Sequence, residues 1–468
     1  MTELDDIADR LHRTVKLALD TGEAASPMEA ERIFAGYKMQ IVAGPDVGKN
    51  RVLQAALLTA VNCAARTLLG GVTVVGVEGE MKVALPPHRN LADAIKGLGG
   101  SVSAVIDPLT PTLVLGDAQP GQVDPLAIRA TFDGWAGGVV PVAGQSRLAE
   151  SGNFTPVGVL AGAMGVSEIF QRLRGGNPYA CRRSVGMNLW RSEQDWRGGD
   201  VGPVLDRLPS SAWLVGLGNL GQAYLWTLGL LPYDDECARI VLQDTDTLAQ
   251  SNLSTSLLTV AADLGRRKTR AMAEWAERRG FETVIVERAF GPDFKVGQND
   301  PSVALIGVDN ALARQAVEGV GFARVIEAGL GGGPQDYLGI DIHTFPASKP
   351  ASEIWAETET GPIDVTMPAY QAMLESTGDP CGTLRLAGRS IGAPFVGAIA
   401  AAMVIAELVR LAMGADRTEM ASFHLRDPMR RVVFKGDAWP AFNIGSTFLR
   451  LPTKPSISEG NWICPRTS

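Results

Sequence analysis

Cysteine is scarce in this sequence, and no two cysteines are arranged as a pair. The five cysteines (Cys63, Cys181, Cys237, Cys381 and Cys464) are scattered along the chain in an odd number and without the spacing of a disulfide framework. This pattern is not that of a disulfide-stabilised secreted domain. We therefore expect the chain to reside in a reducing cytoplasm.

The sequence also lacks a surplus of positive charge, and its first twenty residues are not expected to be a signal peptide. Lys and Arg number 43 against 51 Asp and Glu, which gives a net charge of -8. Because such a balance offers no basic footprint, neither nucleic acid nor a membrane is an expected partner. Residues 1–20 alternate charged and apolar residues, unlike a signal peptide. The most apolar late segment, Ile391 to Met413, contains Glu407 and is interpreted as a buried helix, not a membrane span.

The 468 residues are enough for two to four domains, and hydrophobic periodicity predicts an α/β protein. The expected early elements are an amphipathic helix at Leu4 to Leu19, strands at Met39 to Val42, Gly71 to Val77 and Thr112 to Leu115, and a helix at Val52 to Leu69. The intervening Gly44 to Lys49 is one residue short of P-loop spacing. It is followed by Asn50 where a magnesium ion would need Ser or Thr, so a P-loop is not expected.

The most informative stretch begins at Ala212. An apolar run ends in Gly216-Leu-Gly218-Asn-Leu-Gly221 and passes into an apolar segment, which predicts a buried strand, a tight turn and a helix. Glycines there let the backbone approach a phosphate, and the helix start offers free N–H groups. A second buried strand, Arg239 to Gln243, leads to Asp244 and Asp246, near where a ribose would need an acceptor. This pattern alone indicates a nucleotide site, and an NAD-type Rossmann oxidoreductase stays open.

Further motifs follow in order. They are Ser251-Asn252-Leu253, Asp263-Leu-Gly-Arg-Arg-Lys268 and a third apolar strand that ends in Asp309. Together with the glycine loop and the Asp-x-Asp, they resemble the ThiF/MoeB and ubiquitin-activating (E1) superfamily, well over Ser211 to Gly414 and more weakly before it. The resemblance implies Rossmann-like adenylation lobes with ATP and Mg²⁺ as cofactors. The structural zinc of many MoeB and ThiF relatives is not expected, because the sequence has no Cys-x-x-Cys pair.

The two halves of the chain look like a diverged duplication. Each half has a strand followed by a carboxylate, at Thr112 to Asp117 and at Val303 to Asp309. Each also has an apolar helix in which a Met and a Glu have the same spacing, at Pro156 to Arg174 and at Pro394 to Leu411. Pro45 interrupts the first copy's loop, so that copy should have the fold without the nucleotide site.

We expect an inactive adenylation lobe at 1–175, a connection at 176–209, an active lobe at 210–414 and a β-rich extension and tail at 415–468. Two lobes in one chain is the plan of E1 enzymes, whereas MoeB-like enzymes pair two chains. A monomer is therefore expected.

The resemblance also implies a role for each site residue. Gly216, Gly218 and Gly221 would lie beside the phosphates. Asp244 would bind the ribose, and Asp246 would start the next loop. Asn252 and Lys268 would contact phosphate oxygens, and Asp309 would hold Mg²⁺. Lys268 would also act catalytically by offsetting developing negative charge. Two alternatives stay open. Lys268 could be part of a solvated basic helix start, and Asp309 could be a helix N-cap.

One position departs from the family pattern. The superfamily has an arginine on the phosphates where this chain has Thr255, so either Arg266 or Arg267 compensates, or adenylation is weak or lost. Another arginine of the superfamily comes from the partner lobe and enters the ATP site. In this chain Arg13, in Arg10-Leu-His-Arg13, occupies the matching place. The alternative is that Arg13 is an ordinary exposed residue on a helix.

Cys381 lies shortly before the last apolar helix, in a Gly-flanked polar segment. Smaller E1 enzymes carry there the cysteine that takes the activated carboxylate as a thioester. Without the resemblance, a lone cysteine is more often structural.

These features together predict an E1-like enzyme that activates a ubiquitin-like protein and passes it to an E2-like carrier. It resembles the E1 components of bacterial ubiquitin-like conjugation operons, some of which act in antiphage defence. The alternatives are a catalytically dead scaffold that binds the same small protein, and a ThiF/MoeB-type sulfur-carrier adenylyltransferase.

Overall fold

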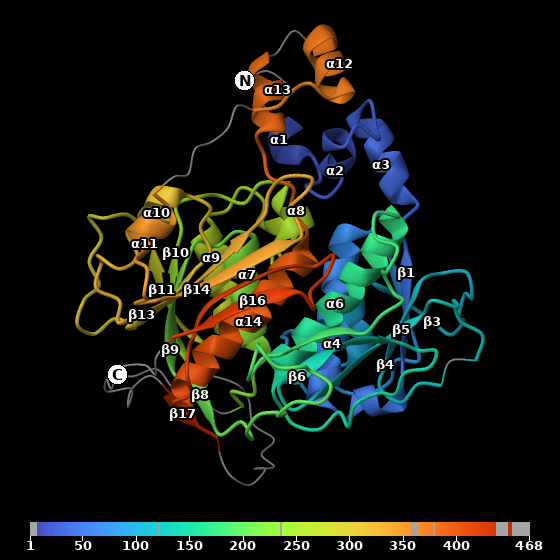
Figure 1. Cartoon of the computed structure of the whole chain (residues 1–468), viewed down its shortest axis with the longest axis horizontal. Coiled ribbons are helices and arrows are strands. Elements are labelled where there is room, and N and C mark those ends of the chain that lie inside the picture. Colours follow the sequence, from blue (N-terminus) through green and yellow to red (C-terminus); the bar gives the residue numbers. More distant parts are fainter. Residues whose placement is uncertain are drawn as a thin grey trace.

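Two α/β lobes pack side by side in the computed structural model (Figure 1). The structure describes residues 7–119, 121–234, 236–356, 363–377, 380–436 and 448–451. Each lobe is built on its own sheet, and a cap of short helices lies over them at the top of the view. The predicted fold class, two Rossmann-like lobes in one chain, is confirmed.

The first lobe has a seven-stranded sheet in the order β3-β2-β1-β4-β5-β6-β7. Its strands are β1 (Met39–Ala43), β2 (Val72–Val75), β3 (Ser101–Ser103), β4 (Thr112–Leu115), β5 (Ile128–Asp133), β6 (Ala136–Pro141) and β7 (Val185–Asn188). Its helices are α1 (Ile7–Arg10), α2 (Lys16–Asp20), α3 (Pro27–Ala35), α4 (Arg51–Thr67), α5 (Leu91–Gly97) and α6 (Thr155–Arg174), with a 3₁₀ turn η1 (Pro45–Gly48).

The second lobe has an eight-stranded sheet in the order β11-β10-β9-β12-β13-β14-β15-β16. Its strands are β9 (Ser211–Val215), β10 (Arg239–Gln243), β11 (Glu282–Val286), β12 (Val303–Ile306), β13 (Arg324–Leu330), β14 (Gly339–Phe345), β15 (Thr418–His424) and β16 (Arg431–Lys435). Its helices are α7 (Asn219–Leu230), α8 (Asn252–Thr255), α9 (Lys268–Arg278), α10 (Ala311–Gln315), α11 (Ala351–Ile354), α12 (Pro368–Thr377), α13 (Pro380–Ala387) and α14 (Pro394–Ala412), with η2 (Ala261–Asp263).

The two sheets share one strand plan. In each, five parallel strands are followed by antiparallel ones: β3-β2-β1-β4-β5 corresponds to β11-β10-β9-β12-β13, and β6-β7 to β14-β15. Such a parallel arrangement needs helices on its faces, and α4 and α7 follow the first strand of each lobe in the same way. This correspondence supports the predicted internal duplication.

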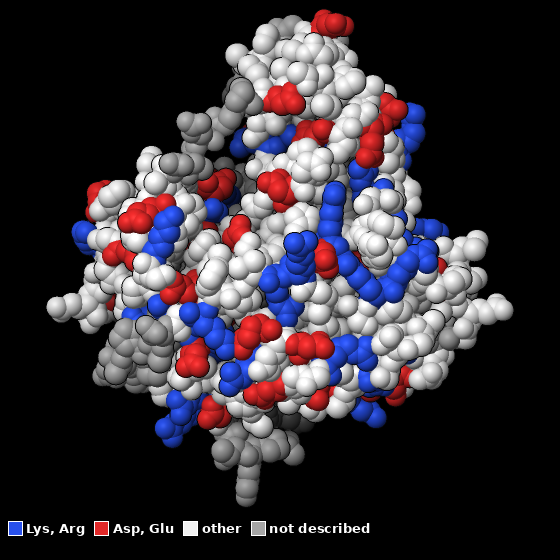
Figure 2. Space-filling model, in the orientation of Figure 1, with Lys and Arg blue, Asp and Glu red and all other residues white. Residues whose placement is uncertain are grey.

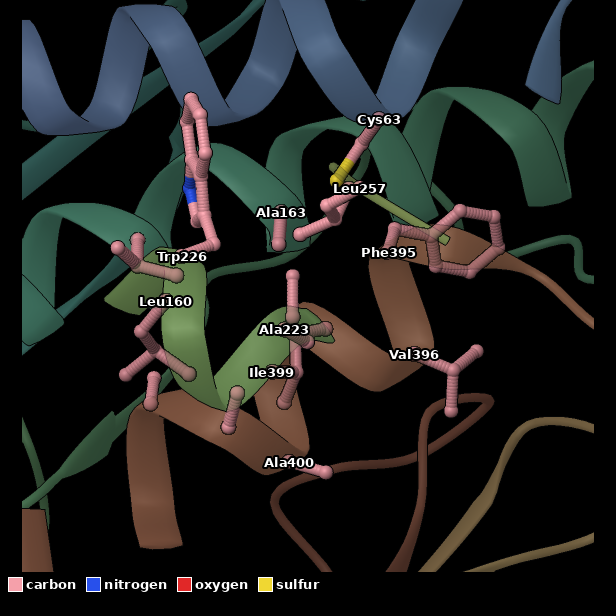
Figure 3. Close-up of a cluster of buried hydrophobic side chains, with 14 of the residues drawn as sticks. Cys63, Leu160, Ala163, Ala223, Trp226, Leu257, Phe395, Val396, Ile399 and Ala400 are labelled. Carbon is pink, nitrogen blue, oxygen red and sulfur yellow. The ribbon is translucent and has the colours of Figure 1, made fainter. Parts of the chain in front are cut away.

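Four long helices bury the junction between the lobes. Helices α4 and α6 of the first lobe pack against α7 and α14 of the second (Figure 3), and the Trp226 indole N–H of α7 donates to Thr59 Oγ1 of α4 at 3.0 Å. Gly158 and Gly162 allow this closeness within the first lobe, because a Cβ on either would collide with backbone carbonyls of α4.

Helix α14 confirms the expectation of a buried helix. Among the described residues it alone is long and apolar enough to cross a membrane, yet it lies wholly inside the protein. Its Glu407 accepts the Thr418 N–H at 2.8 Å and pairs with Arg410 at 2.5 Å. The matching Glu168 of α6 accepts the Cys181 N–H at 2.8 Å. Burial raises the pKa of Glu168 to about 7.

The bounds of the predicted domains need correction. Strand β7 belongs to the first sheet, although residues 176–209 were expected to be a connection, and β15 and β16 complete the second sheet instead of forming a separate extension. A two-stranded sheet pairs β8 (Arg207–Pro209) with β17 (Phe448–Arg450). The predicted tail beyond residue 452 lies outside the described residues.

The predicted helix Leu4 to Leu19 is interrupted. Within its described part, α1 and α2 are separated because the Thr14 hydroxyl donates to the Gly392 carbonyl (2.8 Å) and the His12 ring bonds the Arg66 carbonyl (2.8 Å). These contacts fix the break to α4 and to the segment before α14, while α1 packs on α13 and α2 on α12 within the cap.

The cysteines also differ in part from expectation. Cys63, Cys181 and Cys381 are free, whereas Cys237 is disulfide-bonded, so the expectation of single cysteines is wrong for Cys237. Cys464 lies outside the described residues.

Candidate functional site

A cavity of about 520 Å³ opens where the parallel strands of the second sheet end. The loops after β9, β10 and β12 line it, which is where open α/β sheets bind ligands. The first lobe contributes Arg13, and the segment between α13 and α14 contributes Arg389. The cavity therefore draws on three parts of the chain that are far apart in sequence.

The glycine loop forms one wall of the cavity. Gly216 has a φ of +84°, and a Cβ on Gly221 would collide with the Gly216 carbonyl. A Cβ on Gly218 would meet nothing within 4 Å, so the loop backbone is open at this point. At the start of α7, the Asn219 Oδ1 is buried and has no hydrogen-bond partner in the described part of the chain. An unpaired buried oxygen and an open backbone beside a cavity suit a polar ligand.

Two aspartates and a lysine form the next wall. The Lys268 ammonium lies 2.8 Å from Asp246 Oδ2 and 3.8 Å from Asp244 Oδ2. Asp244 Oδ2 also accepts the Leu217 N–H at 2.6 Å, which ties it to the glycine loop. Lys268 is only 9% exposed, so the alternative of a solvated helix start is wrong. Asp244, Asp246 and Lys268 are thus brought together as predicted, while their proposed roles stay predictions.

Asp309 presents an exposed carboxylate at the cavity, just after β12. The N-cap of α10 is Asn310, whose Oδ1 accepts the N–H groups of Leu312 (2.9 Å) and Ala313 (3.3 Å), so the alternative of Asp309 as the cap is wrong. The described residues contain no cluster of three or more metal-ligating side chains. Asp309 could therefore hold Mg²⁺ only together with ligand or water oxygens, which is how Mg²⁺ is usually bound beside phosphates.

The first lobe holds the cavity's α8 wall in place. Ser251 N–H donates to the Asp9 carbonyl (2.7 Å), and Arg13 donates to Ser254 Oγ from its backbone (3.1 Å) and to Ser251 Oγ from its side chain (3.4 Å). Arg13 is therefore partly buried in the cavity, contrary to the alternative of an ordinary exposed residue. Asn252 also lines the cavity, and its Oδ1 accepts the Ala249 N–H at 2.9 Å.

Arg66 of α4 reaches the same segment from the other side. Its guanidinium donates to the carbonyls of Leu253 (2.8 Å) and Leu257 (3.1 Å) and to Asn62 Oδ1 (2.8 Å). Burial lowers the pKa of this guanidinium to about 10. No sequence motif marks Arg66, because its partners lie almost two hundred residues away.

Sequence reasoning missed three further cations of the cavity, Arg288, Arg314 and Arg389. Only Arg314 had a local signal, since it lies one turn after the strand-end Asp309. Arg266 and Arg267, which were expected to compensate for Thr255, do not line the cavity: Arg266 pairs with Glu274 at 2.7 Å and Arg267 donates to the Thr245 carbonyl.

Side chains fill the corresponding place in the first lobe. Asp46, at the end of β1, accepts the Asp117 N–H at 2.9 Å and pairs with Arg147 at 3.0 Å. Arg147 also pairs with Glu150 at 2.7 Å. A carboxylate thus occupies the gap between the ends of β1 and β4 where the second lobe leaves a cavity, which supports the expectation of a fold without a nucleotide site.

Cys381 lies outside the cavity wall. It is a free, exposed cysteine on α13, which packs against α1 and α12 in the cap. The segment from Cys381 to Arg389 connects it to the cavity edge.

Comparisons with known proteins agree with this architecture. Residues 38–189 match the BilD N-terminal domain family and residues 208–415 the BilD C-terminal domain family. The bacterial E1-like protein BilD of Collimonas sp. (strain OK412) is 43% identical over 416 residues, which cover 87% of this chain and 90% of the relative.

Two crystal structures of E. coli MccB, one with succinimide and one with MccA-N7isoASN, are 13% and 12% identical over 50% of this chain. They align over 64% and 65% of their own chains, under two thirds of their length, with TM-scores of 0.30. A likeness of that size carries no argument about function. The two family matches and the Collimonas relative do, and the chain belongs to the BilD family of bacterial E1-like proteins.

Proposed function

We propose that this chain is an E1-like enzyme that uses ATP and Mg²⁺ to adenylate the C-terminal carboxylate of a ubiquitin-like protein. Cys381 would then take the acyl group as a thioester and pass it to an E2-like carrier. One observation carries the proposal. The glycine loop, Lys268 with its two neighbouring aspartates, and Asp309 meet in one cavity with Arg13 of the other lobe. Membership of an E1-like family supports it.

Adenylation requires a carboxylate oxygen to attack the α-phosphorus of ATP while the bond to the bridging oxygen breaks and pyrophosphate leaves. The site must neutralise phosphate charge and hold the two reactants in line. Lys268 and Arg13 would supply positive charge, and the open backbone at Gly218 would approach the phosphates. Asp244 would accept from the ribose. Asp309 would hold Mg²⁺, which screens the phosphate oxygens when it is bound.

The thioester step would follow at Cys381. Its sulfur attacks the acyl carbon, the bond from that carbon to the AMP oxygen breaks, AMP leaves, and the thiol proton passes to solvent. The free and exposed state of Cys381 supports this role, because the thiol must meet both an acyl-adenylate and a carrier protein. Three predictions remain. A cytoplasmic location rests on the scattered cysteines of the sequence, whereas a monomer and a part in antiphage defence rest on the resemblance.

The decisive experiment is ATP–pyrophosphate exchange by the full chain with a ubiquitin-like protein encoded next to it. Exchange that depends on the small protein is expected. If no exchange occurs but the small protein still binds in a pull-down, the result would favour the catalytically dead scaffold. That alternative is considered because the buried Thr255 stands where the superfamily has an arginine. Exchange without any thiol-sensitive adduct would favour a sulfur-carrier adenylyltransferase. Binding of NAD in place of ATP would favour an oxidoreductase.

A further inference from the structure

Five basic side chains line the cavity, and three of them are held by carboxylates of their own lobe. Lys268 pairs with Asp246 at 2.8 Å, Arg288 with Asp293 at 2.5 Å, and Arg314 with the fully buried Glu327 at 3.1 Å. The other two, Arg13 and Arg389, come from outside the strand-end loops that form the rest of the cavity. They need a separate explanation.

Arg13 and Arg389 are the cations most easily turned to a ligand. Arg13 makes no ion pair with the described residues and donates from its side chain only to Ser251 Oγ, at 3.4 Å. Arg389 pairs with Asp9 at 2.8 Å, but the two side chains are 46% and 45% exposed, and exposed ion pairs contribute little to stability. A competing anion could displace Asp9 at small cost.

The segment that carries Arg389 lies directly over Arg13 and Thr255. A Cβ on Gly392 would be 2.7 Å from Thr255 Cγ2 and 3.5 Å from Arg13 Cβ. The small side chain at 255 therefore leaves room for this segment. Burial and the nearby charge of Arg389 lower the pKa of Arg13 to about 10, so the two cations act on each other across the cavity. Like charges at one cavity edge are unfavourable until an anion lies between them.

We propose that Arg389 is a phosphate-binding residue which, together with Arg13, grips the polyphosphate end of the nucleotide. Asp9 holds Arg389 when the phosphate is absent and gives way to it. Arg389 thereby supplies the positive charge that Thr255 cannot. Because a guanidinium binds phosphate oxygens through two parallel N–H bonds, Lys would replace it only in part. The inference rests on the proposed function, since it assigns the phosphate end of the same cavity.

The test is equilibrium binding by calorimetry to the full chain, with Mg-ATP, tripolyphosphate and adenosine as probes. Arg389→Ala should weaken the binding of Mg-ATP and of tripolyphosphate about ten- to a hundredfold and leave adenosine unchanged, and Arg389→Lys should recover part of the loss. Asp9→Asn should tighten Mg-ATP binding a few-fold, because it removes the competing carboxylate and keeps the backbone contact to Ser251. The opposite signs of Arg389→Ala and Asp9→Asn cannot arise from a general loosening of the fold.

A matched control exists in a second ion pair between the lobes, Arg51 with Asp234 at 2.8 Å, away from the cavity residues. Arg51→Ala should leave all three affinities unchanged. Unaltered Mg-ATP and tripolyphosphate binding in Arg389→Ala, with its melting temperature preserved, would overturn the inference alone. Tripolyphosphate binding that depends on Arg389, in a protein that binds no ATP, would keep the anion site and overturn the proposed function.

Discussion

Replacement of Arg66 by methionine tests whether the first lobe holds the nucleotide cavity together. The guanidinium gives two hydrogen bonds to the second lobe, at the carbonyls of Leu253 and Leu257. Hydrogen bonds from a charged group contribute about 1.5–3 kcal/mol each. Leu257 keeps a second donor, the Asn62 amide at 3.0 Å, whereas Leu253 loses the one side-chain donor that the described residues give it.

Part of this loss is offset. The lowered pKa of Arg66 reflects the cost of burying its charge, and methionine does not bear that cost. We therefore expect Arg66→Met to reduce the free energy of unfolding by about 2–3 kcal/mol. Urea unfolding followed by tryptophan fluorescence measures this change. The apparent KM for ATP in pyrophosphate exchange should rise as well, since Asn252 of α8 and Ser251 just before it line the cavity.

A matched variant separates this effect from the loss of any arginine. Arg270 is 66% exposed and pairs with Glu287 at 2.9 Å on the surface of the second lobe. Arg270→Met should leave both the free energy of unfolding and KM nearly unaltered, because exposed ion pairs contribute little to stability. If Arg66→Met were no more destabilising than Arg270→Met, with an unchanged KM, the reasoning about the lobe junction would be refuted.

Four further predictions concern single residues. Asp309→Ala should abolish pyrophosphate exchange with the fold intact by circular dichroism, and unchanged exchange would remove it as the metal ligand. Cys381→Ala should still form the acyl-adenylate yet give no thiol-sensitive adduct on a non-reducing gel, and an adduct that persists would move the role to another cysteine. Arg13→Ala should cut exchange about ten- to several hundredfold, equivalent to roughly 1.5–3 kcal/mol, without loss of stability, and wild-type rates would show that Arg13 does not serve catalysis. Glu168→Gln should stabilise the protein more at pH 8 than at pH 5. The pKa of Glu168 in the folded state, about 7, lies above the usual 4.5, so the stability of the unchanged protein falls as the pH rises between these two values. An equal effect of the substitution at both pH values in urea unfolding would contradict this.

The surface carries charges of both signs, in line with the 43 basic and 51 acidic residues of the sequence. On the face in view, Asp and Glu side chains are interspersed among Lys and Arg (Figure 2).

The sequence by itself determined the parts of the site that lie within one βα unit or at the end of one strand. Gly216, Asp244 and Asp309 could be placed together because the carboxyl ends of parallel strands meet at one edge of a sheet, and Lys268 could be added from the family resemblance. The buried helix α14 was equally readable, since an apolar run of that length with only two charges, Glu407 and Arg410, is typical of a helix in a protein core. These signals depend on neighbours a few residues away.

Only the tertiary structure decided which distant groups complete the cavity. Arg389 lines it and Arg66 holds its α8 wall through the packing of the lobes and cap, and Asp46 fills the corresponding place in the first lobe. The break between α1 and α2, which depends on contacts to Gly392 and Arg66, was decided there too. The physical reason is that a side chain's partners, burial and pKa depend on surfaces brought together by packing, and residues hundreds of positions apart leave no periodic trace of that contact in the sequence.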